Sequence, residues 1–147
     1  MKRNPLTKTD VKYLRFIAER TEGPSIVSPT MIAKHFNISR VSAMEQLKKL
    51  AEKGYGKYVP RRGFALNEKG SNFAKREARK HRIFECILNE TLGFDKDSVC
   101  DEASKVDFYL SDEVVERMSE MLGHPEVCPC GNPIATADSI KRRKEKT

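Results

Sequence analysis

The order of local patterns in the first 66 residues is the feature that most constrains the fold. A helical spacing of apolar residues begins after Thr7 or Thr9, and two further helical patterns follow at residues 30–36 and 40–53. A Ser-Pro pair opens the second pattern and a serine opens the third, and both are typical helix starts. Two short β-prone runs then flank residues 60–63, Pro-Arg-Arg-Gly, and predict a hairpin with a basic tip. Three helices followed by a basic hairpin predict a winged helix-turn-helix domain.

The remaining patterns are helical, so the expected fold class is mainly α. A long helix without internal proline is expected from Asn67 to about Thr91, and shorter helices at residues 95–109 and, capped by Ser111, at 112–122. Three such helices make a thin core alone, and the interface of a homodimer would supply the missing burial. The expected organisation is a winged domain, an all-helical domain and a disordered basic tail, with bounds at residues 1–75, 76–140 and 141–147.

Charge divides the chain in two. Residues 1–82 contain 20 Lys or Arg against 7 Asp or Glu, whereas residues 83–147 contain 8 against 14. A basic half joined to an acidic half favours a module that binds a polyanion, here double-stranded DNA, although charge alone would also fit a lysine-rich soluble surface. The residues expected to contact DNA lie at the start of the third helix and in the hairpin: Ser39, Arg40, Val41, Ser42, Glu45, Lys48, Arg61 and Arg62.

Several classes of protein are excluded by what the sequence lacks. It has no apolar run behind its N-terminal charges and no stretch long enough to span a bilayer, so we expect a cytoplasmic protein without a membrane partner. In a reducing compartment its four cysteines are thiols or metal ligands rather than disulfides. No nucleophile–base constellation and no glycine-rich phosphate loop occurs, which argues against an enzyme.

Three residues indicate a metal site in the second half. His81 and Glu85 are four residues apart in a helical stretch, so both project from one face, and Cys100 follows after a break at Gly93. Imidazole, carboxylate and thiolate together suit a divalent ion such as iron, zinc or cobalt. Cys128 and Cys130 are further candidates, although a lone Cys-x-Cys is a weak signal by itself.

Four strings carry a resemblance to a known family: RKHRIFE (79–85), LGFDKDSVCDEA (92–103), LSDEV (110–114) and LGHPEVCPCGNPI (122–134). The chain resembles the diphtheria-toxin-repressor family of iron- and manganese-dependent repressors over nearly all of residues 6–135. The resemblance implies a homodimer of subunits with a winged DNA-binding domain and a helical dimerisation and metal domain, and Fe²⁺ or Mn²⁺ as the cofactor. Many members add an SH3-like domain, which we do not expect in a chain of this length.

The resemblance also implies two metal sites. One matches at His81 and Glu85, with Cys100 in place of the usual histidine, a replacement that makes Zn²⁺ plausible as well. The other, usually regarded as regulatory, falls on Lys12, Ser104, Asp107 and Phe108, of which only Asp107 keeps ordinary ligand chemistry. An ammonium at Lys12 paired with Asp107 could replace the ion as a clamp, or the site is simply lost.

We therefore expect a metal-responsive transcriptional regulator that represses genes of metal uptake from a palindromic operator. One alternative is a constitutive DNA-binding regulator that needs no metal. A second, from another class, is a metal-buffering or interaction protein that uses the acidic half.

Overall fold

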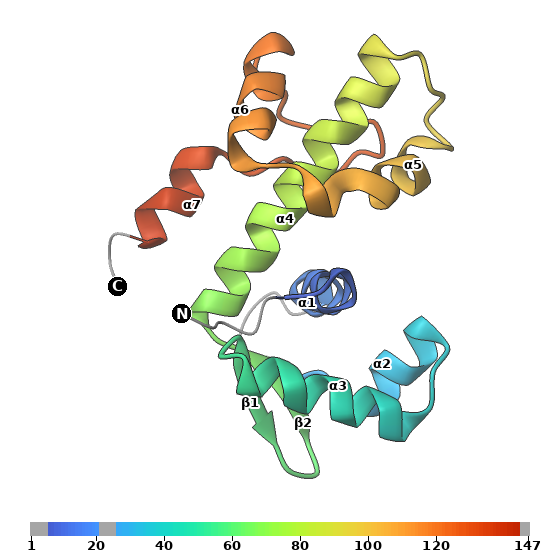
Figure 1. The fold of residues 1–147 in the computed structure, drawn as a ribbon, viewed down its shortest axis with the longest axis vertical. Helices are drawn as coiled ribbons and strands as arrows, with labels where there is room; N and C mark the ends of the chain where they lie inside the picture. The colour runs from blue at the N-terminus through green and yellow to red at the C-terminus, as the bar shows by residue number, and fades with distance from the viewer. Residues whose placement is uncertain (1–5, 21–25, 145–147) are drawn as a thin grey trace. The chain divides into compact units, whose positions relative to one another are not determined.

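A computed structural model describes residues 6–20 and 26–144, with side chains to residue 140. The chain divides into two units, Met1–Ala74 and Lys75–Thr147. The first unit holds three helices, an antiparallel hairpin and the start of a fourth helix: α1 (Lys8–Arg20), α2 (Pro29–Phe36), α3 (Arg40–Glu52), β1 (Gly56–Val59), β2 (Gly63–Leu66) and α4 (Glu68–Cys86) (Figure 1). The predicted winged helix-turn-helix is confirmed.

Local capping positions the helix-turn-helix as the sequence predicted. The Ser28 hydroxyl accepts from Met31 N, and the Ser39 hydroxyl accepts from Ser42 N at 3.0 Å. Asn37 joins the two helices in the left-handed region, with φ of 54°. Because these caps satisfy the first free N–H groups of α2 and α3, the start of α3 is held in one conformation.

The hairpin is anchored by a third extended segment. Val27 forms a bridge with Phe64, with N–O distances of 2.9 Å in both directions. Gly63, beside this bridge, has a φ of 131°, and a Cβ at this position would collide with the carbonyl of Val27. The predicted hairpin with Arg61 and Arg62 at its tip is therefore tied to the chain before α2.

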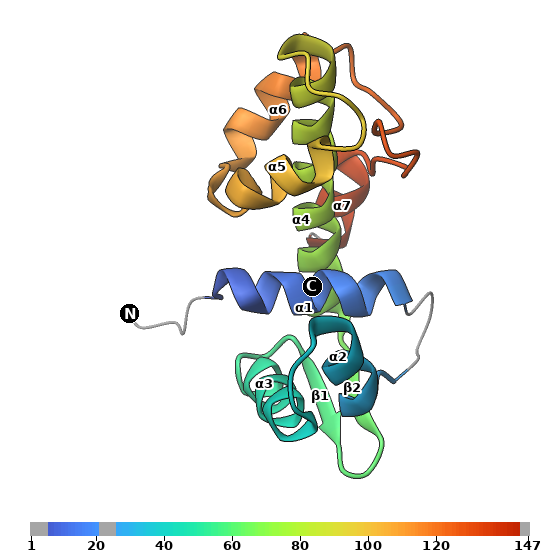
Figure 2. The same ribbon diagram turned by 90° about the vertical axis from the view of Figure 1, so that its right-hand side faces the viewer.

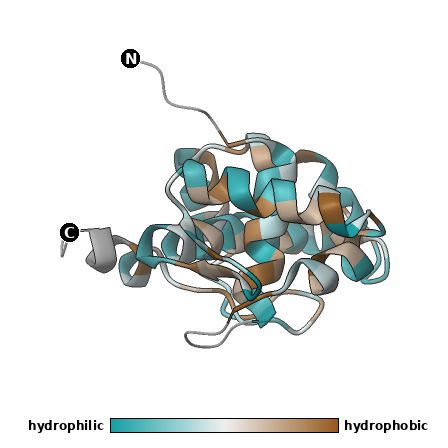
Figure 3. Ribbon diagram, turned by 90° about the horizontal axis from the view of Figure 1, so that it is seen from below, coloured by the Kyte–Doolittle hydropathy of each residue, from teal (hydrophilic) through white to brown (hydrophobic). Residues whose placement is uncertain are grey.

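A single apolar core holds the first unit together. Leu14 and Ile17 of α1, Ile32 of α2 and Leu47 of α3 are fully buried, as is Phe64 of β2. On α1 a buried carboxylate supplements this core. Asp10 accepts hydrogen bonds from Lys53 Nζ at 2.7 Å and from Gln46 Nε2 at 3.2 Å. Its carboxylate also accepts a hydrogen bond from Thr7 N, which caps the start of α1. Figure 3 shows hydrophilic and hydrophobic residues mixed along the helices of the chain, as expected for amphipathic helices.

All named secondary-structure elements in the described residues of the second unit are helical. It contains the rest of α4, a π-helical turn η1 (Ile87–Thr91), α5 (Val99–Val106), a 3₁₀ turn η2 (Asp107–Tyr109), α6 (Asp112–Met121) and α7 (Ala137–Lys144). Helices α5 and α6 lie beside the C-terminal part of α4, as Figures 1 and 2 show from two sides. The mainly helical fold class is confirmed.

Two predicted helices differ from the observed ones, and one observed helix was not predicted. The long helix does not stay α-helical to Thr91, because Leu92 N donates to Ile87 O, five residues earlier, and the turn before Gly93 is a π-helix. The fifth helix begins at Val99 rather than Asp95, since the Asp95 side chain and carbonyl hold residues 95–98 in a turn. Helix α7 covers residues for which the sequence predicted loop and tail. Residues 145–147 of the predicted tail lie outside the described part.

Candidate metal centre

Helix α4 presents a histidine and a carboxylate side by side in its buried face. His81 is 3% exposed and Glu85 is 1% exposed. Their spacing of four residues brings His81 Nε2 within 3.5 Å of Glu85 Oε2. A buried pair of this kind is costly unless charge or a bound cation satisfies it.

Cys100 completes a group of three at the start of α5. Its sulfur lies 3.5 Å from His81 Nε2. The neighbouring Val99 is fully buried in a cluster with Leu88 of η1 and Phe84 of α4, and this packing holds the first turn of α5 against the end of α4. The ligand atoms of His81, Glu85 and Cys100 all lie within 4.8 Å of one another, so the structure brings together the three residues predicted as ligands.

These separations fit a first-row ion. Bonds of about 2.0 Å to nitrogen or oxygen and 2.3 Å to sulfur place tetrahedral ligand atoms roughly 3.3–3.8 Å apart. The two measured separations from His81 Nε2, 3.5 Å to Cys100 and 3.5 Å to Glu85, fall in this range. The donor set therefore suits a divalent transition metal.

The second nitrogen of His81 is held by Asp107. The Nδ1–Oδ2 distance is 2.8 Å, and both side chains are buried. When His81 is neutral, as a metal ligand must be, a carboxylate that accepts the Nδ1 proton leaves the Nε2 lone pair facing Glu85 and Cys100. Sequence reasoning missed this role for Asp107, because the two residues are 26 positions apart and no periodicity links them.

A second group of ligand atoms forms around the same glutamate. Glu85, Cys128 and Cys130 lie within 4.8 Å of one another, and Cys130 Sγ donates to Glu85 Oε2 at 3.2 Å. Cys86, the fourth cysteine, is buried with its sulfur toward Val127 O and belongs to neither group among the described residues.

The surroundings shift the pKa of Cys130 upward and the pKa of Glu85 downward. Burial raises the pKa of the Cys130 thiol to about 12, with the Glu85 carboxylate adding to the effect. Burial also acts to raise the pKa of Glu85, but the hydrogen bond and charge of a protonated His81, together with hydrogen bonds from Cys130 and Cys128, outweigh burial, and the pKa lies below its ordinary value. Without a cation the centre therefore holds an ionised carboxylate next to a protonated thiol.

The residues assigned by resemblance to the second metal site have other partners in the helical unit. The Ser104 hydroxyl donates to Cys100 O at 2.8 Å, and Asp107 holds His81. Phe108 is half-buried, and its carbonyl accepts from Lys80 Nζ at 3.3 Å. Lys12 is an exposed residue of α1 in the other unit.

The residues predicted to contact DNA share an accessible surface. Each of them is exposed, either at the start and on the outer side of α3 or at the hairpin tip: Ser39, Arg40, Val41, Ser42, Glu45, Lys48, Arg61 and Arg62. The apolar Val41 is 60% exposed. The Ser39 hydroxyl also caps α3, and Lys48 Nζ stands over the Tyr58 ring at 5.5 Å.

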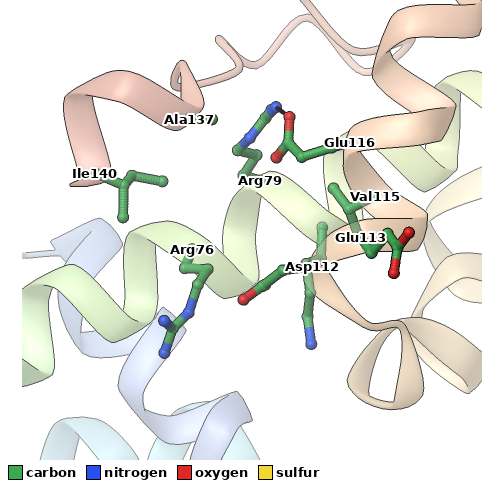
Figure 4. Close-up of a pocket in the computed structure, with 9 residues that line it drawn as sticks. Arg76, Arg79, Asp112, Glu113, Val115, Glu116, Ala137 and Ile140 are labelled. Carbon is green, nitrogen blue, oxygen red and sulfur yellow. Dashed lines mark hydrogen bonds and ion pairs between the residues drawn. The ribbon is translucent and has the colours of Figure 1, made fainter.

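A pocket of about 350 Å³ lies between α4, α6 and α7 (Figure 4). It contains none of the candidate metal ligands. Arg79 on its wall pairs with Glu116 at 2.6 Å, and Lys80 pairs with Glu77 at 2.9 Å, so these cations are used to join or brace helices. These ion pairs therefore connect or stiffen the helices that line the pocket.

A winged helix-turn-helix unit followed by a helical unit with a nitrogen, oxygen and sulfur ligand cluster points to the class of metal-dependent transcriptional repressors. Residues 5–64 match the model of the iron dependent repressor N-terminal DNA binding domain, and residues 67–136 match that of the iron dependent repressor metal binding and dimerisation domain. The chain belongs to the iron-dependent repressor family, which includes the diphtheria toxin repressors.

Individual relatives agree with this assignment. The chain is 38% identical over 92 residues to an uncharacterized HTH-type transcriptional regulator of Methanocaldococcus jannaschii, covering 63% of this chain and 74% of that protein. It is 31% identical to the diphtheria toxin repressor of Corynebacterium glutamicum, covering 88% of this chain but 57% of the repressor. The chain thus spans less than two thirds of such longer relatives.

Solved structures show the same fold. A manganese-dependent transcriptional repressor in complex with manganese superposes with a TM-score of 0.78 at 33% identity, covering 88% of this chain and 59% of that one. A hypothetical protein from Sulfolobus solfataricus superposes with a TM-score of 0.74 at 26% identity, covering 89% of this chain and 100% of that one. In the described residues no helix is long and apolar enough to cross a membrane.

Proposed function

We propose that this chain is a metal-responsive DNA-binding regulator that represses genes of metal uptake. The observation that carries the proposal is the convergence of His81, Glu85 and Cys100 within 4.8 Å, in a chain whose other unit is a winged helix-turn-helix. A homodimer would present two recognition helices related by a two-fold axis, which suits a roughly palindromic operator.

The cofactor in this proposal is a divalent transition metal held by His81, Glu85 and Cys100. Fe²⁺ and Mn²⁺ follow from the family, which includes the manganese-bound repressor above. Cys100 favours Fe²⁺ or Zn²⁺ over Mn²⁺, because a thiolate is a soft ligand. A bound ion would supply the positive charge that draws three ligands together. The protein's own contribution is to orient His81 through Asp107 and to exclude water from Glu85.

DNA recognition in this proposal uses the accessible start of α3 and the hairpin. In this proposal Arg40, Ser42 and Glu45, which are exposed, contact base edges and phosphates, while Arg61 and Arg62 add salt-dependent contacts to the DNA backbone. The other family site, at Lys12, Ser104, Asp107 and Phe108, is altered in this chain and contributes no metal. We propose that the Lys12 ammonium takes the place of that ion.

The test is a fluorescence-anisotropy titration on promoter DNA of metal-transporter genes from the source genome. It is run with chelator and then with Fe(II), Mn(II), Zn(II) or Co(II). We expect at least tenfold tighter binding with metal, which corresponds to about 1.4 kcal/mol. Cys100→Ser should abolish this difference, since Cys100 is exposed and its replacement removes a ligand without opening the core.

Ser104→Ala, one helical turn along α5, is the control and should retain the response to metal. Equal and sequence-specific affinity with chelator and with metal would refute metal sensing and leave a constitutive regulator. Weak binding to duplex DNA with a shallow salt dependence would instead favour the metal-buffering class.

A further inference from the structure

The Lys80 ammonium is buried between α4 and the 3₁₀ turn η2. Lys80 is 7% exposed, and its Nζ donates to Phe108 O at 3.3 Å and to Leu110 O at 3.1 Å. A third acceptor is the Glu77 carboxylate on the preceding turn of α4, whose Oε2 lies 2.9 Å from Nζ. Three acceptors match the three N–H groups of an ammonium, so the polar end of this side chain is fully used.

Both carbonyls lie at the end of the turn that carries Asp107. Turn η2 begins at Asp107, and Leu110 is the residue that follows it. Carbonyls at the end of a helical turn have no partner within the turn, and here the Lys80 ammonium supplies one. At the start of the same turn, the Asp107 carboxylate accepts from His81 Nδ1 at 2.8 Å. Turn η2 is therefore attached to α4 at both ends.

The two attachments come from consecutive residues of α4. Because Lys80 and His81 are neighbours in a helix, the α4 backbone sets their relative positions. With the end of η2 held, the Asp107 carboxylate stays against His81 Nδ1. Nε2 of the same ring then keeps facing Glu85 and Cys100, the other two predicted ligands. A loosened turn would let the imidazole rotate or exchange tautomers, and either change takes the Nε2 lone pair away from the site.

The buried ion pair can be removed as a unit. Glu77 and Lys80 are 6% and 7% exposed. Replacing one of them alone would leave an unmatched buried charge, whereas replacing both by apolar side chains of similar volume is often tolerated. A double replacement by methionine therefore removes the donor to η2 without burying a lone charge.

We propose that Lys80 is a positioning residue of the metal centre, which acts through η2 and Asp107 to keep His81 oriented for a divalent ion. This inference rests on the proposed function for the metal site and adds a residue that supplies no ligand atom. An ammonium has no lone pair to offer a cation, so the effect of Lys80 is carried by the backbone of η2.

The variant Glu77→Met/Lys80→Met tests this role in the full-length protein. Competition with a chromophoric chelator measures the affinity for Zn(II), and circular dichroism establishes that the fold is retained. We expect the variant to lose roughly tenfold in affinity, at the lower end of the range for groups that support a ligating histidine. In an Asp107→Asn background the same replacement should change the affinity by less than about twofold, because the turn then has no carboxylate to position.

Arg79→Met/Glu116→Met is the matched control. This neighbouring ion pair has an N–O distance of 2.6 Å and joins α4 to α6 rather than to η2. Its removal should change the affinity for Zn(II) by less than about twofold. An equal loss in this control, or an equal loss from Glu77→Met/Lys80→Met with and without Asp107, would assign the effect to general packing and overturn the positioning role.

NMR of the metal-free protein gives a readout that does not depend on metal binding. The chain has three histidines, and the nitrogen shifts of a neutral imidazole ring report its tautomer. We expect the Nδ1–H form of His81 in the unaltered protein and a mixture of tautomers in Glu77→Met/Lys80→Met. The same tautomer in both would overturn the proposal, as would unchanged affinity for Zn(II). If the unaltered chain binds no metal, only the proposed function fails, because the tautomer measurement still decides the role of Lys80.

Discussion

Replacement of Asp107 by asparagine tests whether the metal centre is built as described. Asp107→Asn keeps the size of the side chain but removes the negative charge that holds His81 Nδ1 at 2.8 Å. The amide can also present its NH₂ group to the ring, which would move the proton to Nε2 and block the nitrogen that faces Glu85 and Cys100. Either outcome weakens metal binding at His81, Glu85 and Cys100 without removing any of these three residues.

The structure indicates the size of the effect. Loss of a carboxylate that orients a ligating histidine costs roughly 10- to 100-fold in metal affinity, or about 1.4 to 2.7 kcal/mol. His81 and Asp107 are 3% and 8% exposed, so water cannot readily replace the lost acceptor. We therefore expect a loss in the upper part of that range.

Competition with a chromophoric zinc chelator measures this change, with circular dichroism to establish that the fold is retained. Asp101→Asn is a matched control on the same helix, because Asp101 has an 83% exposed side chain and only a 3.7 Å contact to Lys105. The control should change metal affinity by less than about twofold. Unchanged affinity in Asp107→Asn, or an equal loss in Asp101→Asn, would refute the orienting role.

Three further predictions concern the DNA-binding unit and the altered site. Asp10→Asn should lower the free energy of unfolding by about 2 kcal/mol in chemical denaturation, because it breaks a buried charge-assisted bond to Lys53, and a loss under about 0.5 kcal/mol would contradict the structure. The double variant Arg61→Ala/Arg62→Ala should reduce the slope of log K against log salt by about 1 for each lost phosphate contact, and an unchanged slope would remove the hairpin from the interface. Lys12→Met should weaken operator binding if this lysine replaces an ion, whereas unchanged affinity would show that the altered site is merely lost.

Local chemistry explains what the sequence could predict. The starts of α2, α3 and α6 follow from Ser28, Ser39 and Ser111, because a cap bonds to the backbone three residues away. The pairing of His81 with Glu85 follows from helical periodicity in the same way. These interactions join residues three or four positions apart, so the local sequence is enough to predict them.

The features that could not be predicted depend on tertiary packing. Asp107 meets His81 across 26 residues, and Cys130 meets Glu85 across 45. Neither pair has a spacing that any periodicity would select. The π-helical turn after Cys86 could not be predicted from composition either. It is defined by the hydrogen bond from Leu92 N to Ile87 O, and no residue type in 87–91 specifies that bond.

The contact between His81 and Cys100 has a consequence for folding. A cation bound by both residues would close a loop of 19 residues, and this restricts the unfolded chain much as a cross-link does. The same chain-entropy relation that is used for disulfides gives about 3 kcal/mol for a loop of that length. In a helical unit with a small apolar core, such a staple would be a substantial share of the total stability. Metal starvation would then reduce the lifetime of the folded protein as well as its affinity for an operator, and the cell could lose the regulator through turnover when the metal is scarce.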